Sequence, residues 1–192
     1  MGKIVLATGG ARSGKSTFAE KYLQDRYRVV GYIATAIAFD DEMKLRIAKH
    51  QSQRPSHWKT YEAYKNLDIL VKDIDLEAEA CLLDCLTIMV TNWMMDANHI
   101  DWNVPDPAAV NQLQEEILDA TLMLLETIKT LDLTVAFVTN ELGMGIVPEN
   151  PMARAFRDIA GRVNQLVAFH ADEVYLLVCG LPMTLKPYGT SL

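Results

Sequence analysis

The sequence predicts an α/β protein of three layers, in which helices cover both faces of a mostly parallel central sheet. Apolar runs recur along the chain, and they are continuous rather than alternating, as expected of strands buried on both faces. The segments between them carry apolar side chains three or four residues apart, the pattern of amphipathic helices. Strands that alternate with helices favour parallel pairing. The predicted strands are residues 3–8, 29–35, 80–84, 134–139 and 173–178.

Helices are predicted between these strands. The first follows Ser16, and another begins at Asp40 or Asp41, either of which can cap a helix that ends before Pro55. Two longer helices are predicted over residues 110–131 and 152–169. The clearest long loop is the segment 98–107.

Composition restricts the classes of function. The 192 residues suit a single domain, 1–192, and half of them are apolar. No apolar run approaches the roughly 18 residues of a membrane span, and the start lacks the features of a signal peptide, which predicts a cytoplasmic protein. A net charge of −7 argues against a nucleic-acid partner, because binding to the phosphate backbone requires a basic face. The cysteines, which lie in apolar segments, are expected to be buried free thiols: Cys81, Cys85 and Cys179.

Residues 9–16, GGARSGKS, match the phosphate-loop pattern G-x-x-x-x-G-K-[ST] between a predicted strand and a predicted helix. The glycines allow backbone N–H groups to turn toward phosphate oxygens, and the following helix directs its positive end at the anion. Lys15 is expected to bridge the β- and γ-phosphates, and Ser16 is expected to coordinate Mg²⁺. The sequence therefore predicts a P-loop NTPase fold that binds a nucleoside triphosphate.

A second ligand for the metal is expected from another strand end. The run ACLLD, residues 80–84, is apolar and ends in Asp84, which is the usual form of that strand. The alternative is that Asp84 caps a helix that begins in the next residues.

His50 lies at the border of an apolar and a charged stripe on the helix predicted before Pro55. Met43 and Ile47 share its face, while Glu42 and Arg46 form an ion pair beside it. Spacing alone favours an ordinary boundary histidine. A neutral imidazole there can also act as a nucleophile toward phosphorus, so both interpretations stay open.

A glycine-containing segment, residues 138–148, follows the fourth strand at the sheet edge where open α/β proteins bind ligands. The helix after it carries polar side chains along one face: Arg154, Asp158, Arg162 and Gln165. That face is either a solvated charged surface or a surface for a substrate or another subunit.

Taken together, these segments resemble the bifunctional adenosylcobinamide kinase / adenosylcobinamide-phosphate guanylyltransferase family of cobalamin biosynthesis. The resemblance runs nearly end to end, but it leaves out residues 96–110 and carries no function onto the tail from residue 181. The matching segments are TGGARSGKS (8–16), YIATA (32–36), DDEMKLRIAKH (40–50), RPSHWKTYE (54–62), LLDCLT (82–87), TN (91–92), TNELGMGIVPEN (139–150) and ARAFRDIAGRVNQ (153–165).

The resemblance implies a RecA-like P-loop domain, a homotrimer and two reactions in one region. A nucleoside triphosphate, ATP or GTP, phosphorylates adenosylcobinamide, and GTP then donates GMP through a covalent guanylyl-histidine, which would be His50 here. Lys15 is the other implied catalytic residue, and Ser16 and Asp84 are the implied Mg²⁺ ligands. The implied nucleotide-binding residues are Gly9, Gly10, Ala11, Arg12, Ser13, Gly14, Lys15, Ser16, Thr35, Ala36, Gln51, Ser52, Gln53, Arg54, Glu62 and Asp84.

Two other functions fit parts of the pattern. A P-loop ATPase or GTPase switch would hydrolyse its nucleotide without covalent catalysis and would need no nucleophilic histidine. A kinase-only relative would lack the guanylyl step.

Overall fold

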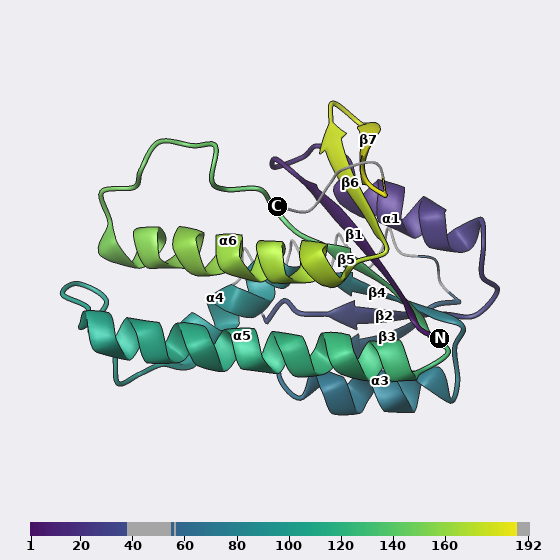
Figure 1. Ribbon diagram of the computed structural model, residues 1–192, viewed down its shortest axis with the longest axis horizontal. Coiled ribbons are helices and arrows are strands. Elements are labelled where there is room, and N and C mark those ends of the chain that lie inside the picture. Colours follow the sequence, from purple (N-terminus) through teal and green to yellow (C-terminus); the bar gives the residue numbers. More distant parts are fainter. Residues whose placement is uncertain (38–54, 56, 188–192) are drawn as a thin grey trace.

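The computed structural model describes residues 1–37, 55 and 57–187, and within them seven strands form a single sheet in the order β3-β2-β4-β5-β1-β6-β7 (Figure 1). All neighbouring strands pair in parallel except β6 and β7, which are antiparallel. The strands are β1 (Lys3–Gly9), β2 (Val30–Ala34), β3 (Lys59–Glu62), β4 (Ala80–Asp84), β5 (Thr134–Val138), β6 (Glu173–Val178) and β7 (Leu181–Lys186). The helices are α1 (Lys15–Gln24), α3 (Leu67–Asp75), α4 (Leu86–Asp96), α5 (Pro107–Thr130) and α6 (Pro151–His170).

The sheet separates two apolar cores, one on each face. Successive side chains of a strand point to opposite faces, so Ile4 and Leu6 pack with α3, α4, α5 and α6, while Val5 and Ala7 pack with α1. Figure 1 shows the same division, with α1 on one side of the sheet and the longer helices on the other. The arrangement is the predicted three-layer α/β P-loop fold, and its RecA-like feature is that β5 lies between β1 and β4.

The carboxyl ends of the central strands meet at one edge of the sheet. Ala34 of β2 is in register with Asp84 of β4, and Asp84 is in register with Val138 of β5. Val138 is in turn opposite Ala7, two residues before the end of β1. This alignment brings the P-loop, which follows β1, to the same edge as the residues that follow β2, β4 and β5.

Of the two longest helices, α5 begins three residues and α6 one residue before the position predicted from its apolar face. In each, a side chain caps the first turn: Asp106 accepts from the Ala108 amide at 3.0 Å, and Asn150 accepts from the Ala153 amide at 3.0 Å. A proline follows each cap, at the position where the missing N–H costs nothing. The five predicted strands agree with the structure to within one residue at each end.

Other features differ from the predictions or add to them. Strands β3 and β7 were not predicted, since β3 is short and nearly every side chain of β7 is exposed. Cys179 is exposed rather than buried, because it lies at the turn of the β6–β7 hairpin. The helix predicted from Asp40 or Asp41 lies outside the described residues. No helix in the described part of the chain is both long enough and apolar enough to cross a membrane.

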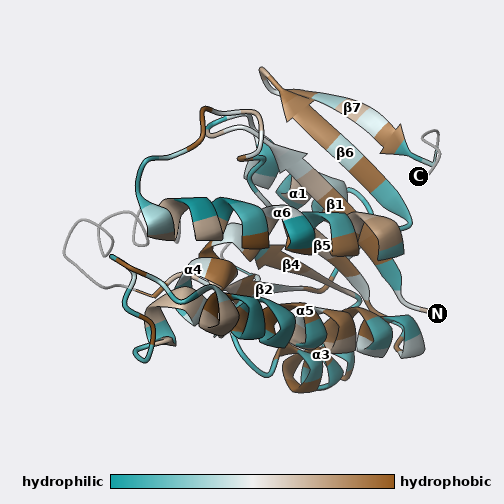
Figure 2. Cartoon of the chain, turned by 60° about the vertical axis from the view of Figure 1, so that its left-hand side comes forward, coloured by the Kyte–Doolittle hydropathy of each residue, from teal (hydrophilic) through white to brown (hydrophobic). Residues whose placement is uncertain are grey.

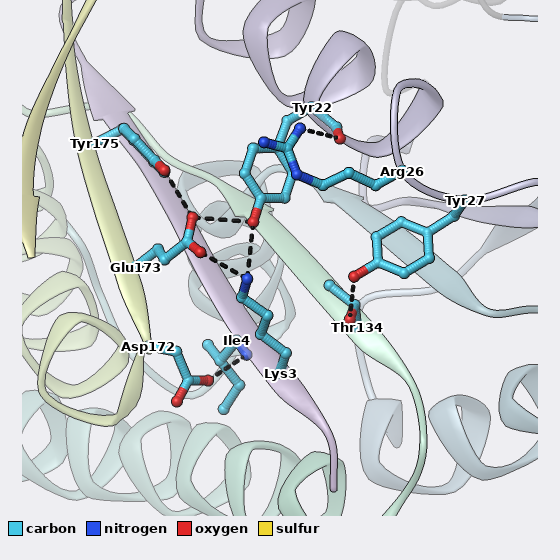
Figure 3. Close-up of polar contacts among 9 residues, drawn as sticks. All are labelled: Lys3, Ile4, Tyr22, Arg26, Tyr27, Thr134, Asp172, Glu173 and Tyr175. Carbon is cyan, nitrogen blue, oxygen red and sulfur yellow. Dashed lines mark hydrogen bonds and ion pairs between the residues drawn. The ribbon is translucent and has the colours of Figure 1, made fainter. Parts of the chain in front are cut away.

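A half-buried polar cluster joins α1 to the amino-terminal ends of β1 and β6 (Figure 3). The Lys3 ammonium lies 2.6 Å from Glu173 Oε1, and the hydroxyls of Tyr22 and Tyr175 donate to Glu173 Oε2 at 2.9 and 2.6 Å. The Arg26 guanidinium stacks over the Tyr22 ring, 4.0 Å from its centroid. One carboxylate therefore connects β1, α1 and β6.

Candidate active site

The P-loop leaves β1 at Gly9 and enters α1 at Gly14, and both glycines have positive φ values, 153° and 94°. A Cβ atom at Gly9 would lie 2.5 Å from the Leu177 carbonyl oxygen, so no side chain fits there. Arg12 also adopts a positive φ, 56°, and the Ser13 amide donates to the Gly10 carbonyl at 3.3 Å. These conformations make a tight turn at the positive end of α1, as anion binding requires.

Lys15 lies inside the loop and is only 6% exposed. Its ammonium donates to the Gly10 carbonyl oxygen at 2.6 Å and approaches Ser13 Oγ at 3.5 Å. Burial lowers the pKa of Lys15, and electrostatic interactions with Cys85 and Asp84 partly oppose that shift. A desolvated ammonium at this place gains strongly from an anion such as a phosphate.

Asp84 ends β4 and is half-buried, with Tyr32 donating its hydroxyl hydrogen to Oδ2 at 3.0 Å. It does not cap the following helix: Cys85 is the N-cap of α4, and no side chain makes a capping bond there. Helix α1, which carries the half-buried Ser16 in its first turn, packs against β4. The hydroxyl of Ser16 and the carboxylate of Asp84 are hard oxygen ligands of the kind that Mg²⁺ prefers in nucleotide sites.

A pocket of about 460 Å³ lies beyond the carboxyl ends of β2 and β3. It brings together three of the residues that the resemblance assigned to the nucleotide, Thr35, Ala36 and Glu62. Glu62 is exposed, whereas Thr35 is only 1% exposed. The remaining lining residues are Ala34, Ile37, Ala63, Tyr64 and Lys65.

A buried polar network that was not predicted lies behind the P-loop, at the ends of β4 and β5. Asn140 Nδ2 donates to Thr87 Oγ1 at 2.9 Å, and Thr87 Oγ1 lies 3.1 Å from Cys85 Sγ. Asn164 of α6 donates to the Asn140 carbonyl at 3.1 Å and accepts from Thr139 Oγ1 at 2.7 Å. The only local signal was the position of Thr139 and Asn140 directly after an apolar strand.

The charged face of α6 divides into two parts. Arg154 donates to the carbonyl oxygens of Pro148 and Glu149 at 3.0 and 2.6 Å, so it holds the end of the preceding loop. Asp158, Arg162 and Gln165 instead line a cleft between α5 and α6.

The remaining predicted site residues lie outside the described part of the chain: His50, Gln51, Ser52, Gln53 and Arg54.

Comparison with known proteins gives consistent results. Residues 5–185 match the family model described as cobinamide kinase / cobinamide phosphate guanyltransferase, CobU. The chain is 45% identical over 183 residues to a Salmonella typhimurium protein named bifunctional adenosylcobalamin biosynthesis protein CobU, covering 95% of this chain and 99% of that one. It is 43% identical over 188 residues to the Escherichia coli protein of the same name, covering 95% and 99% of the two chains. It is 39% identical over 182 residues to the Pseudomonas aeruginosa protein CobP, covering 94% and 96%.

Among solved structures, a KaiC-like protein from Pyrococcus horikoshii superposes with a TM-score of 0.47 at 14% identity, covering 91% of this chain and 70% of that one.

Proposed function

The chain belongs to the cobinamide kinase / cobinamide phosphate guanyltransferase family, and on that premise we propose that it catalyses both reactions of the family name on adenosylcobinamide. It phosphorylates adenosylcobinamide with ATP or GTP, then transfers GMP from GTP to the product, forming adenosylcobinamide-GDP and pyrophosphate. The observation that carries this proposal is the P-loop lysine buried beside Asp84, within a chain that matches the bifunctional relatives over almost its whole length.

In the kinase step, the backbone of residues 9–16 holds the triphosphate and Lys15 neutralises charge on the transferring phosphoryl group. The substrate hydroxyl forms a bond to the γ-phosphorus, loses its proton, and releases the nucleoside diphosphate. When bound, Mg²⁺ would add positive charge at the β- and γ-phosphates, held by Ser16 and Asp84.

In the guanylyl step, a ring nitrogen of His50 attacks the α-phosphorus of GTP, forming a P–N bond as pyrophosphate leaves. A phosphate oxygen of adenosylcobinamide phosphate then attacks the same phosphorus, and the P–N bond breaks to restore the histidine. Two displacements replace one, which is the usual benefit of a covalent intermediate. Gln51, Ser52, Gln53 and Arg54 follow His50 directly, and together with Thr35, Ala36 and Glu62 they would hold the rest of the nucleotide.

The protein is proposed to be a cytoplasmic homotrimer of a single domain, 1–192. The β6–β7 hairpin contains apolar residues (Figure 2). Several of them are exposed, including Leu181 and Met183 at 69% and 55%. Others lie on the loop after β5, where Ile146 is 97% exposed. Contiguous exposed apolar surface favours contact with another protein chain, and the family resemblance supplies the trimer as that partner.

One experiment tests the covalent step. The protein is incubated with α-labelled GTP and Mg²⁺, and a labelled protein–GMP adduct that is acid-labile and base-stable is expected. His50→Ala should abolish the adduct and leave phosphorylation of adenosylcobinamide intact, whereas His99→Ala, an exposed loop histidine, should change neither. A wild-type protein that phosphorylates adenosylcobinamide without forming an adduct would be a kinase-only relative. Hydrolysis of nucleotide with neither transfer would favour a P-loop switch.

A further inference from the structure

Thr35, directly after β2, is bonded to the strand end that carries Asp84. Its hydroxyl donates to the Cys85 carbonyl oxygen at 2.9 Å and accepts from the Cys85 amide at 2.8 Å. Its own amide donates to the Asp84 carbonyl oxygen at 3.2 Å. Thr35 thus makes three hydrogen bonds to the main chain of two consecutive residues, and its hydroxyl uses its hydrogen and one lone pair in two of them.

Asn92 also holds Thr35, through the carbonyl oxygen of that residue. This side chain of α4 is 1% exposed, and its Nδ2 donates to the Thr35 carbonyl oxygen at 2.6 Å. Its Oδ1 is buried and accepts no hydrogen bond from any residue that the structure describes. An unpaired buried carbonyl is costly, so packing alone does not account for an asparagine here. The bond to Thr35 does account for it.

The bonds converge on Asp84. Tyr32 holds its carboxylate at 3.0 Å, while Thr35 holds its carbonyl oxygen and the next residue. Asp84 in this position acts on the buried ammonium of Lys15. Main-chain movement at Asp84 would therefore move the carboxylate relative to both Lys15 and the P-loop.

We propose that Thr35, anchored by Asn92, is a positioning residue that fixes the Asp84 carboxylate for the Mg²⁺–nucleotide complex. The role given to Asp84 rests on the proposed function. The resemblance put Thr35 beside the nucleotide, but its hydroxyl contacts the Asp84–Cys85 main chain. The hydroxyl of Thr35 therefore acts on the nucleotide indirectly, through the metal ligand, whatever contact the rest of the residue makes.

The test measures binding of a fluorescent, non-hydrolysable GTP analogue as a function of Mg²⁺ concentration. Thr35→Val keeps the size and β-branching of the side chain but removes both hydroxyl bonds. It should raise the Mg²⁺ concentration for half-maximal binding about tenfold, the order of magnitude expected when hydrogen bonds that position a group are lost. Thr35→Ser keeps the hydroxyl and should restore the wild-type midpoint to within about twofold. Binding in EDTA should be the same for all three proteins.

Thr121→Val is the matched control. Thr121 is also 1% exposed, but its hydroxyl donates to the Ile117 carbonyl within α5. Thr121→Val should lower thermal stability as Thr35→Val does, but it should leave the Mg²⁺ concentration for half-maximal binding unchanged. If Thr35→Val does not fold, Asn92→Leu provides the second variant, since it removes the anchor and the unpaired oxygen together and should raise the midpoint in the same direction.

A folded Thr35→Val protein with the wild-type Mg²⁺ midpoint would overturn the proposal. So would a loss of affinity that is equal with Mg²⁺ and with EDTA, because that result would mean a direct contact between the hydroxyl and the nucleotide. The proposed function fails separately: wild-type protein that binds Mg²⁺–GTP but does not phosphorylate adenosylcobinamide would refute it and leave the Mg²⁺ shift of Thr35→Val as evidence for positioning.

Discussion

The ammonium of Lys15 occupies the loop that it serves, 2.6 Å from the Gly10 carbonyl oxygen and almost out of contact with water. Its neighbour Cys85 is also buried, and burial raises the pKa of that thiol to about 11, so the thiol stays neutral beside the P-loop. Lys15 is thus a buried cation within the P-loop, placed to neutralise a bound triphosphate.

Lys15→Ala should reduce both proposed reactions on the order of 10²- to 10³-fold, as expected when a group that stabilises transition-state charge is removed. Phosphoryl transfer to adenosylcobinamide and formation of the GMP adduct are measured separately. Lys21→Ala, an exposed lysine of α1, is the control and should retain both activities. Loss of one reaction alone in Lys15→Ala would contradict a shared triphosphate site.

The pKa of Glu173 is also set by its surroundings, although this residue has a structural role (Figure 3). Burial raises the pKa of its carboxyl, but hydrogen bonds from Lys3, Tyr175 and Tyr22 outweigh burial and hold the pKa below its ordinary value. A carboxylate whose pKa is lowered by folding stabilises the folded state above its unfolded pKa, and this contribution is lost as pH falls through the folded pKa.

Glu173→Gln should lower the free energy of unfolding by about 1–3 kcal/mol at neutral pH, because it weakens several hydrogen bonds to a charged acceptor. The difference from wild type should be constant above about pH 5 and should shrink as the pH falls toward 3. Urea unfolding at several pH values measures it. Glu126→Gln, on an exposed part of α5, should show a small difference at every pH, and an equally pH-independent difference for Glu173→Gln would contradict the assignment.

At the scale of the element, the turn between β6 and β7 supports the P-loop. The Gly180 amide donates to the Ser13 carbonyl oxygen at 2.9 Å, and a Cβ atom at Gly14 would lie 3.2 Å from the Gly180 Cα. Gly180 has a φ of 80°, which L side chains rarely adopt. The hairpin therefore contacts the loop through main-chain atoms that only glycine brings so close.

Gly180→Val should cost about 1–2 kcal/mol of stability from backbone strain and should raise the KM for the nucleoside triphosphate more than it lowers kcat. Thermal unfolding and steady-state kinetics measure the two effects. Gly161→Ala, within α6, is the stability control. The added carbon meets no atom within 4 Å apart from the adjoining backbone of the helix, so this variant should stabilise the protein by about 0.5–1 kcal/mol. An unchanged KM in folded Gly180→Val would show that the hairpin does not hold the P-loop.

At the scale of the whole molecule, the β6–β7 hairpin has a second property. It places apolar residues at the edge of the sheet (Figure 2), and several of them are exposed. An edge strand with free backbone groups and apolar side chains associates readily unless it is covered. The proposed trimer would cover it.

The double variant Leu181→Ser, Met183→Ser should convert the trimer to monomer, measured as mass by light scattering after size exclusion. Leu76→Ser is the matched control. Leu76 is 84% exposed, but it lies at the end of α3, the helix that follows β3, and β3 and β7 form opposite edges of the sheet. A double variant that keeps the mass of three chains would exclude the hairpin as the subunit contact. A wild-type monomer would exclude the trimer itself.

Features that depend on neighbouring residues could be predicted from the sequence alone. The glycines at 9 and 14 specify the P-loop because each backbone conformation is set within a few residues. Five strands were predicted because a continuous apolar run is expected wherever both faces of a strand are buried. Asp84 was located at a strand end for the same reason, by the end of such a run.

Contacts between segments far apart in the chain could not be predicted and are seen in the folded structure alone. Thr35 bonds to Cys85 across 50 positions of the chain, and Asn92 reaches Thr35 across 57. Gly180 meets Ser13 because β6 happens to pair with β1. The side chains of β7 do not alternate between buried and exposed, so the sequence showed no periodic pattern that would indicate a strand. The partners of these polar groups follow from the order of the strands in the sheet, and that order is set by the packing of the whole chain rather than by any local pattern.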